Sequence, residues 1–173
     1  IIKLFNRFLV NPITHIGRYI IFCWSLFTQW FYPPVSIKLL LQHMEFVGVK
    51  SVQIIILSSI MVGGVFGIQF GTVFRLFGIE SMIGAAASFA LSKELGPVIG
   101  AFLVAGRAGS AMAAEIANMK VNEQIDALKV LAVDPVGYLA SPRVLAAMIM
   151  MPLLNGFFII FGMLAAYLSG ITL

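Results

Sequence analysis

A lysine and a glutamate stand side by side at the midpoint of an otherwise uncharged stretch. Twelve uncharged residues, 81–92, precede Lys93 and Glu94, and twelve more, 95–106, follow them. A helix over this stretch, at about 1.5 Å per residue, would cross the roughly 30 Å hydrocarbon core of a membrane and hold both charges near its centre. Because each charge costs on the order of 2.5–3.5 kcal/mol there, we expect protein or trapped water around the pair.

The two charged side chains cannot satisfy each other. Neighbouring helical residues point about 100° apart, so Lys93 and Glu94 each need a separate partner. We predict a polar interior site that supplies these partners. The alternative is that one helix stops near Ser92 and the pair lies in a turn before Gly96 and Pro97.

The composition is that of a membrane protein. The 173 residues are 61% apolar and only 10% charged, with a mean hydropathy of +1.04, whereas a soluble domain is roughly 25% charged. The uncharged stretches 51–74, 81–106 and 144–173 can each span a bilayer. They predict an all-α polytopic protein with at least three transmembrane helices. Ser141 is the expected N-cap of the third helix, with Pro142 at its first position.

The N-terminal part has a different character. Residues 19–32 are apolar and aromatic, but the run is only fourteen residues long before Pro33 and Pro34. This length and the aromatic content predict an elbow helix that lies in the membrane interface or enters the membrane and returns. A short tilted span is the alternative. We therefore divide the chain into an interfacial region, 1–50, and a transmembrane domain, 51–173.

The basic residues indicate the orientation. Nine of the eleven lysines and arginines precede the first predicted span or lie between the second and third. The positive-inside tendency places these segments in the cytoplasm. The connection 106–143 is therefore predicted to be cytoplasmic.

Within this connection, 110–132 is predicted to be one amphipathic helix. Its apolar residues form a single stripe that its charged residues avoid; the stripe comprises Val121, Ile125, Leu128 and Ala132. The polar face carries both charge signs, which favours docking to a soluble partner, although a linker helix on the membrane surface is the alternative. Asp134 is expected to cap the helix that follows, because Pro135 has no amide hydrogen to satisfy.

Small residues recur every four positions in two segments. They are Gly63, Gly67 and Gly71 in the first predicted span, and Ala101, Ala105 and Gly109 after the charged pair. Such ladders allow close approach of another helix. The spacing leaves open whether that helix belongs to the same chain or to a second copy.

The sequence offers little for catalysis or metal binding. Cys23 is the only cysteine, and neither His15 nor His43 has a second ligand at helical spacing. The chain contains no Gly-Lys dipeptide, hence no phosphate-binding loop of the Gly-x-x-x-x-Gly-Lys type, and no G-x-S-x-G nucleophile motif. We expect neither a metal site nor an enzyme.

Six short segments carry a further signal: KELGPV at 93–98, AGRAGSA at 105–111, AEI at 114–116, MKV at 119–121, EQIDAL at 123–128 and AVDP at 132–135. This string closely resembles the MlaE-type permease family. Members are the membrane subunits of ABC transporters that work with MCE-domain proteins in lipid transport across the envelope. Members usually carry further spans, so the resemblance implies that C-terminal spans are missing here.

The resemblance implies a multi-pass homodimer in the bacterial inner membrane that moves phospholipid and does not bind nucleic acid. ATP would be bound by a separate cytoplasmic ATPase and no cofactor by this chain; an MCE-domain periplasmic protein and a small STAS-domain protein would be further partners. The residues expected to contact the ATPase are Glu115, Met119, Glu123, Asp126 and Leu128. Those expected to line the lipid cavity are Lys93, Glu94, Ile68, Phe70 and Phe74.

Two other functions are consistent with the charged pair. The chain could be an ion- or proton-coupled carrier in which Glu94 titrates, or a scaffold that only assembles partners. A requirement for ATP would separate the transporter from the carrier, and a dry interior around Lys93 would favour the scaffold.

Overall fold

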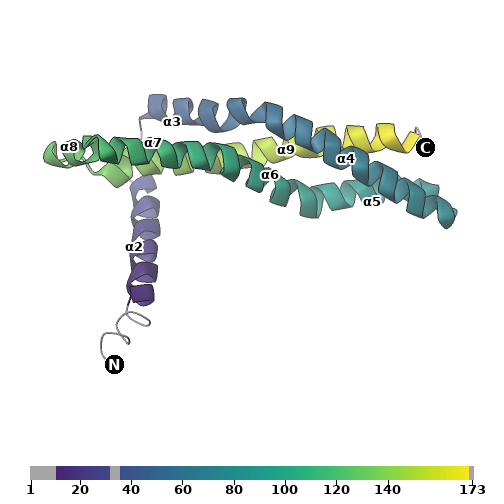
Figure 1. The fold of residues 1–173 in the computed structure, drawn as a ribbon, viewed down its shortest axis with the longest axis horizontal. Helices are drawn as coiled ribbons and strands as arrows, with labels where there is room; N and C mark the ends of the chain where they lie inside the picture. Colours follow the sequence, from purple (N-terminus) through teal and green to yellow (C-terminus); the bar gives the residue numbers. More distant parts are fainter. Residues whose placement is uncertain (1–10, 32–35, 172–173) are drawn as a thin grey trace.

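Three long helices run side by side, and a further helix meets them with one end and projects away from them (Figure 1). The computed structural model describes residues 11–31 and 36–171. The three long helices, Ile37–Leu76, Ile83–Val121 and Val136–Ile171, are each long and apolar enough to cross a membrane. The prediction of an all-α protein with at least three membrane spans is therefore confirmed.

Each long helix is built from shorter segments. In chain order the elements are α2 (Asn11–Phe31), α3 (Ile37–Met44), η2 (Glu45–Val49), α4 (Lys50–Leu76), η3 (Glu80–Met82), α5 (Ile83–Ala90), η4 (Leu91–Leu95), α6 (Gly96–Val104), η5 (Ala105–Gly109), α7 (Ser110–Val121), α8 (Gln124–Val130), η6 (Val136–Ala140) and α9 (Ser141–Ile171). We call the end that carries α8 the cytoplasmic end, as the basic residues predict, and the opposite end the outer end.

The segments η2, η4, η5 and η6 are π-helical turns inside otherwise continuous helices. In η4, the N–H of Gly96 bonds the carbonyl of Leu91, five residues back. Pro97, the next residue, favours this wide turn, because it has no N–H and its ring would clash with the carbonyl of Lys93 in a regular α-helix. Proline alone does not impose a π turn, since α9 runs through Pro152 without one. Because π turns are rare and often occur at functional sites, their positions are informative.

The alternative of a turn at the charged pair is wrong, because Lys93 and Glu94 lie within the second long helix. Asp134 does cap the third long helix, since its carboxylate accepts hydrogen bonds from the N–H groups of Val136 (3.1 Å) and Gly137 (3.4 Å). Ser141 is not the N-cap. The helix begins one π turn earlier, and Ser141 lies buried inside it.

The prediction of one helix over 110–132 is also wrong. The second long helix does not stop at the predicted membrane boundary near 106 but continues through α7 to Val121. The chain then reverses, with Glu123 in the left-handed region at φ 56°, before α8 begins. The apolar stripe predicted a single helix, but its residues belong to two. Val121 ends α7 and is 81% exposed, whereas Ile125 and Leu128 lie in α8 and are half-buried.

The core lies between α4 and α9. Every fourth residue of α4 is buried, in a row that comprises Ser51, Ile55, Ser59, Gly63, Gly67 and Gly71. A Cβ atom on Gly63 would overlap the backbone of Gly162, and one on Gly67 would overlap Ala166. The glycine ladder of the first span thus packs against a helix of the same chain, with the backbones in direct contact.

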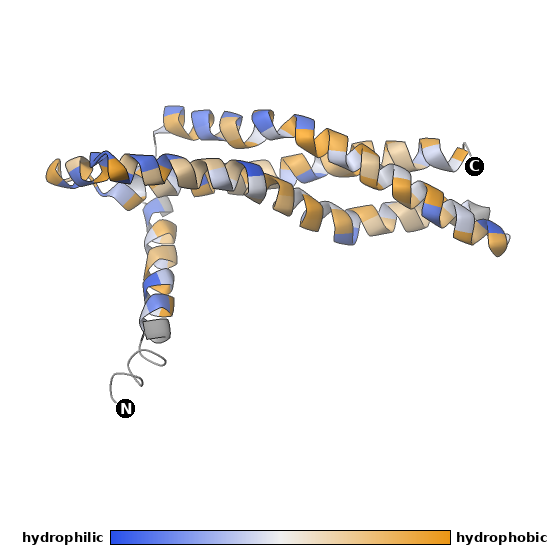
Figure 2. Cartoon of the chain, in the orientation of Figure 1, coloured by the Kyte–Doolittle hydropathy of each residue, from blue (hydrophilic) through white to orange (hydrophobic). Residues whose placement is uncertain are grey.

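Helix α2 runs transverse to the long helices and meets them only at its C-terminal end (Figure 1), and apolar residues occur along most of it (Figure 2). It has 21 residues and starts earlier than predicted. Tyr19 is 73% and Trp24 70% exposed. A helix that runs transverse to the spans and exposes aromatic side chains suits the membrane interface. The expected stop at Pro33 and Pro34 lies outside the described residues, as does 1–10.

Candidate functional site

The charged pair lies at the middle of the apolar layer. Gly63 is the thirteenth residue of the 24-residue uncharged stretch 51–74 and packs against Gly162 of α9. A Cβ on Gly162 would also lie 3.4 Å from the side chain of Leu91, which is fully buried. Leu91, Gly63 and Gly162 therefore share one depth. Lys93 and Glu94 follow Leu91 by two and three residues.

Both charged side chains are exposed in the single chain, on the side of η4 that faces away from the core. The inward side of this turn is formed by Leu91 and Gly96, both buried. At mid-membrane depth, an exposed charge needs water, a ligand or another protein surface. The structure thus leaves the charged pair available to a neighbour that the single chain does not supply.

A third polar side chain lies near this depth, on the inward side, and sequence reasoning missed it. A Cβ on Gly96 would come within 2.8 Å of Asn155 Oδ1, which is buried and has no hydrogen-bond partner among the described residues. Asn155 is the only amide side chain in the uncharged stretch 144–173. Its position as a lone amide in an apolar span could have identified it from the sequence, because a buried amide there is costly unless it serves packing or function.

The predicted apolar cavity wall lies at another depth. On α4, the Phe70 ring stacks on that of Phe74 (centroids 5.9 Å apart) and lies tilted against that of Phe66 (5.5 Å). The rise of a helix puts Phe70 and Phe74 about 10 and 16 Å from Gly63, toward the outer end. Ile68 lies between, 50% exposed. The single chain therefore does not bring these three side chains together with the charged pair.

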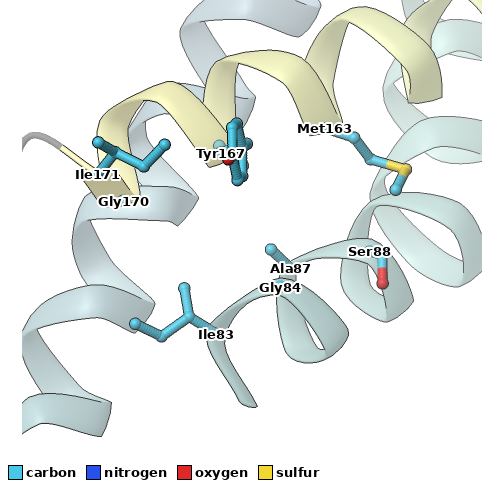
Figure 3. A pocket seen from close by; sticks show the side chains of 9 residues that line it. Ile83, Gly84, Ala87, Ser88, Met163, Tyr167, Gly170 and Ile171 are labelled. Carbon is cyan, nitrogen blue, oxygen red and sulfur yellow. The ribbon is translucent and has the colours of Figure 1, made fainter. Parts of the chain in front are cut away.

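An apolar pocket of about 360 Å³ lies at the outer end, between α5 and α9 (Figure 3). Ile83 and Ala87 form one wall, and Met163 and Tyr167 the other. The only side-chain polar groups on its walls are the hydroxyls of Ser88 and Tyr167 and the thioether of Met163. The pocket has no charged group, so it suits hydrocarbon rather than a headgroup.

Arginine side chains tie the long helices together toward the cytoplasmic end. Arg107 Nη1 donates to the Phe46 carbonyl and to Ser51 Oγ, both at 2.9 Å, and its guanidinium lies 5.2 Å from the centroid of the Phe46 ring. Arg143 Nη1 donates to the Leu139 carbonyl at 2.8 Å. Both carbonyls belong to π turns, η2 and η6. The arginines thus fix the irregular turns from which the spans emerge.

The second small-residue ladder differs from the first. Ala101 is half-buried, but Ala105 and Gly109 are exposed, and a Cβ on Gly109 would meet nothing within 4 Å. This ladder faces away from the core of the single chain.

A metal site is not formed within the described residues, 11–31 and 36–171. Among them, no three side chains of histidine, cysteine, aspartate or glutamate lie close enough together to hold a metal ion.

The comparisons with known proteins agree with this geometry. Residues 40–173 match the family described as Permease MlaE. This chain belongs to the MlaE permease family. The match covers nearly all of the three long helices and the α7–α8 connection, but not α2.

Named relatives give the same assignment. The chain is 38% identical to a probable ABC transporter permease protein of Rickettsia felis over 156 residues, 90% of this chain and 60% of the relative. It is 43% identical to the intermembrane phospholipid transport system permease protein MlaE of Haemophilus influenzae over 133 residues, 77% of this chain and 51% of the relative. It is 45% identical to a probable ABC transporter permease protein of Synechocystis over 123 residues, which are 71% of this chain and 47% of the relative. The chain thus matches about half to three-fifths of each relative.

In this member of the MlaE permease family, the residues expected to contact an ATPase fall into two groups. Glu115 pairs with Arg143 at 3.0 Å, and Met119 is half-buried, so both face the bundle. Glu123, Asp126 and Leu128 belong to the tip, at the reversal and in α8.

The tip is held by two ion pairs. Asp126 accepts hydrogen bonds from Lys120 (2.6 Å) and Lys129 (2.9 Å), so it ties α8 back to α7. These hydrogen bonds lower the pKa of the Asp126 carboxyl. In Figure 1, α8 forms the extreme cytoplasmic end of the molecule.

Proposed function

We propose that this chain is the permease subunit of an ABC transporter that moves phospholipids between membranes of a bacterial cell envelope. It would act in the inner membrane as a pair of identical chains. The observation that carries the proposal is the outward-facing pair Lys93 and Glu94 at the middle of the apolar layer. A transport subunit rather than an enzyme is what the permease family suggests.

The charged pair would recognise the lipid headgroup while it crosses the membrane. Lys93 would attract the phosphate, and Glu94 would hold an amine or a water network. Because an isolated charge is costly at this depth, the pair should face a solvated hollow rather than acyl chains. A second copy of the chain would close that hollow. The exposed ladder at Ala105 and Gly109, on the same long helix, is a surface that such a copy could approach closely.

The energy would come from a separate ATPase that binds ATP in the cytoplasm. One continuous helix of 39 residues, Ile83–Val121, carries the charged pair and leads to the tip at α8. A displacement of the tip by the ATPase would therefore be passed along a single helix to the π turn η4. Glu123, Asp126 and Leu128 are the proposed contacts. An MCE-domain protein on the outer side and a small STAS-domain protein are the other partners that we propose.

The proposal is tested by replacing Lys93 and Glu94 together with leucine. In sealed vesicles with the copurified subunits, ATP-dependent movement of a labelled phospholipid should fall by at least about tenfold, since two charged contacts are lost. Lys38→Leu removes a charge from the cytoplasmic end of the first long helix and should leave transport unchanged. Unaltered transport in the double variant would reject the site, and transport driven by a proton gradient without ATP would favour a carrier.

A further inference from the structure

A second polar site lies at the cytoplasmic end. A pocket of about 550 Å³ is formed by α3 and η2 on one side, α7 on another, and η6 with the start of α9 on the third. Its charged wall residues are Glu45, Lys50, Glu115 and Arg143, and His43 and Tyr138 also line it. Two acids thus stand beside two bases in one hollow.

The rim of the pocket at Lys50 lies at the depth of lipid headgroups. Lys50 is the last charged residue before the uncharged stretch 51–74. His43, on the far side of the pocket, lies about 10 Å further toward the cytoplasm by helical rise, against roughly 5–8 Å for one headgroup layer. The pocket therefore begins where the hydrocarbon ends.

Helix α2 marks the same depth independently. Its Gln29 lies against Gly137, where a Cβ would meet Gln29 Oε1 at 3.0 Å. The next two residues, Tyr138 and Leu139, line the pocket. Because α2 runs transverse to the spans and exposes aromatic residues that prefer the interface, the pocket wall next to it belongs to the interface as well.

The wall of the pocket contains a buried arginine. Arg143 is only 5% exposed, and its Nη1 and Nη2 are bonded to Leu139 and Glu115, whereas its Nε has no partner among the described residues. At the rim, Lys50 lies over the Phe46 ring with its ammonium 5.4 Å from the ring centroid, and its side chain is exposed.

The balance of charge selects the kind of ligand. Arg143 and Glu115 pair with each other, which leaves Lys50 and Glu45 as the charges of the hollow that form no ion pair among the described residues. A simple anion would be attracted by Lys50 but repelled by Glu45, whereas a group that carries a phosphate and an ammonium together would satisfy both signs. Since Lys50 lies at headgroup depth, a lipid can present such a group to the rim of the pocket.

We propose that this pocket binds the headgroup of a zwitterionic aminophospholipid from the cytoplasmic leaflet. The phosphate lies toward Lys50, and the ammonium lies toward Glu45. The inference rests on the proposed function only for the class of lipid. The position is separate from the mid-membrane pair: Leu91, two residues before Lys93, packs at the level of Gly63, which is about 20 Å along α4 from Lys50.

The experiment measures lipid binding rather than transport. The full-length protein, with the subunits that copurify with it, is titrated in detergent with phosphatidylethanolamine or phosphatidylglycerol, and bound lipid is counted by native mass spectrometry. Lys50→Gln should weaken binding of both lipids about tenfold, because it removes a charged contact to the phosphate. Glu45→Gln should weaken only phosphatidylethanolamine. Lys38→Gln, which removes a charge on the same helix outside the pocket, should change neither.

Competition identifies the source of the bound group. Soluble glycerophosphoethanolamine should displace the lipid at high concentration, whereas inorganic phosphate should not. Displacement by phosphate alone, or equal binding in all variants, would overturn the proposal. So would release of a copurified subunit by Lys50→Gln with lipid binding unchanged, since the pocket would then be a protein contact. Loss of transport in the Lys93 and Glu94 variant is a separate result, so the two proposals can fail independently.

Discussion

The side-chain amide of Gln29 donates a hydrogen bond to the carboxylate of Asp134, 105 residues further along the chain. The same carboxylate caps the third long helix through the N–H groups of Val136 and Gly137. One side chain thus holds the transverse helix α2 and also starts a membrane span. Asp134 follows α8 by only a few residues, so it links the cytoplasmic tip to the interface helix.

We predict that Asp134→Ala loosens both elements and that Gln29→Ala loosens only α2. Loss of a cap typically costs about 1 kcal/mol, whereas loss of Gln29 leaves the cap in place. Hydrogen exchange in lipid nanodiscs can separate the two effects. The amides of Val136 and Gly137 should exchange faster in Asp134→Ala but not in Gln29→Ala. The amides of α2 should exchange faster in both variants. Equal exchange at Val136 in the two variants would contradict the shared role.

We predict that Gly63→Ala destabilises the protein and that the neighbouring Gly64→Ala does not. A Cβ on Gly63 would overlap the backbone of Gly162, so α4 and α9 must separate, at a cost of about 1–3 kcal/mol. Gly64 has open space around its Cβ position and should gain roughly 0.5–1 kcal/mol from better helix propensity. Thermal unfolding in detergent measures both. Similar melting temperatures for the two variants would show that the α4–α9 packing is not as close as described.

We predict that Pro97→Ala raises stability but lowers transport. Alanine restores an N–H that can bond to the Lys93 carbonyl, so the π turn η4 can close to a regular α-helix. Because a π turn holds about one residue more than an α turn, closing it rotates the two flanking segments by about 100° relative to each other, which moves Lys93 and Glu94 to a new direction. Pro152→Ala in α9 is the control, because α9 has no π turn at that proline. Unchanged transport in Pro97→Ala would show that the π turn does not set the direction of the pair.

We predict that the α7–α8 reversal stays closed over most of the pH range. The hydrogen bonds from Lys120 and Lys129 lower the pKa of Asp126, so the folded form binds this proton more weakly than the unfolded form. The contribution is therefore fully present above the usual carboxyl pKa of about 4 and is lost as the pH falls through the lowered value. Exchange of the amide of Glu123 should rise only below about pH 4.

The matched variant for this test is Asp126→Asn, which has no titrating carboxyl at that position. Its reversal should exchange faster than that of the wild type at neutral pH and, after correction for the intrinsic pH dependence of exchange, show no further change as the pH falls below about 4. The effect should be small and should diminish at high salt, since both ion pairs are exposed. A pH response that persists in Asp126→Asn would assign it to another group.

The sequence alone determined the spans and the depth of the charged pair. The uncharged stretches that contain Gly63 and Lys93 are local properties of the chain, and hydrocarbon thickness translates their length into depth. The cap at Asp134 was also predictable, because it depends on two neighbouring residues. The end of α7 at Val121 was not, since helical periodicity continues across a reversal that only backbone conformation reveals.

Only the tertiary structure decided which surfaces meet. It paired the ladder at Gly63 with Gly162 and left the ladder at Gly109 exposed, although the two have the same spacing. It also brought Arg143 against Glu115 and left Asn155 Oδ1 without a partner in the part of the chain that the structure describes. These facts depend on which helix faces are brought together from distant parts of the chain. The spacing of small residues within one helix indicates that the face can pack closely against another helix, but it does not indicate which helix that is.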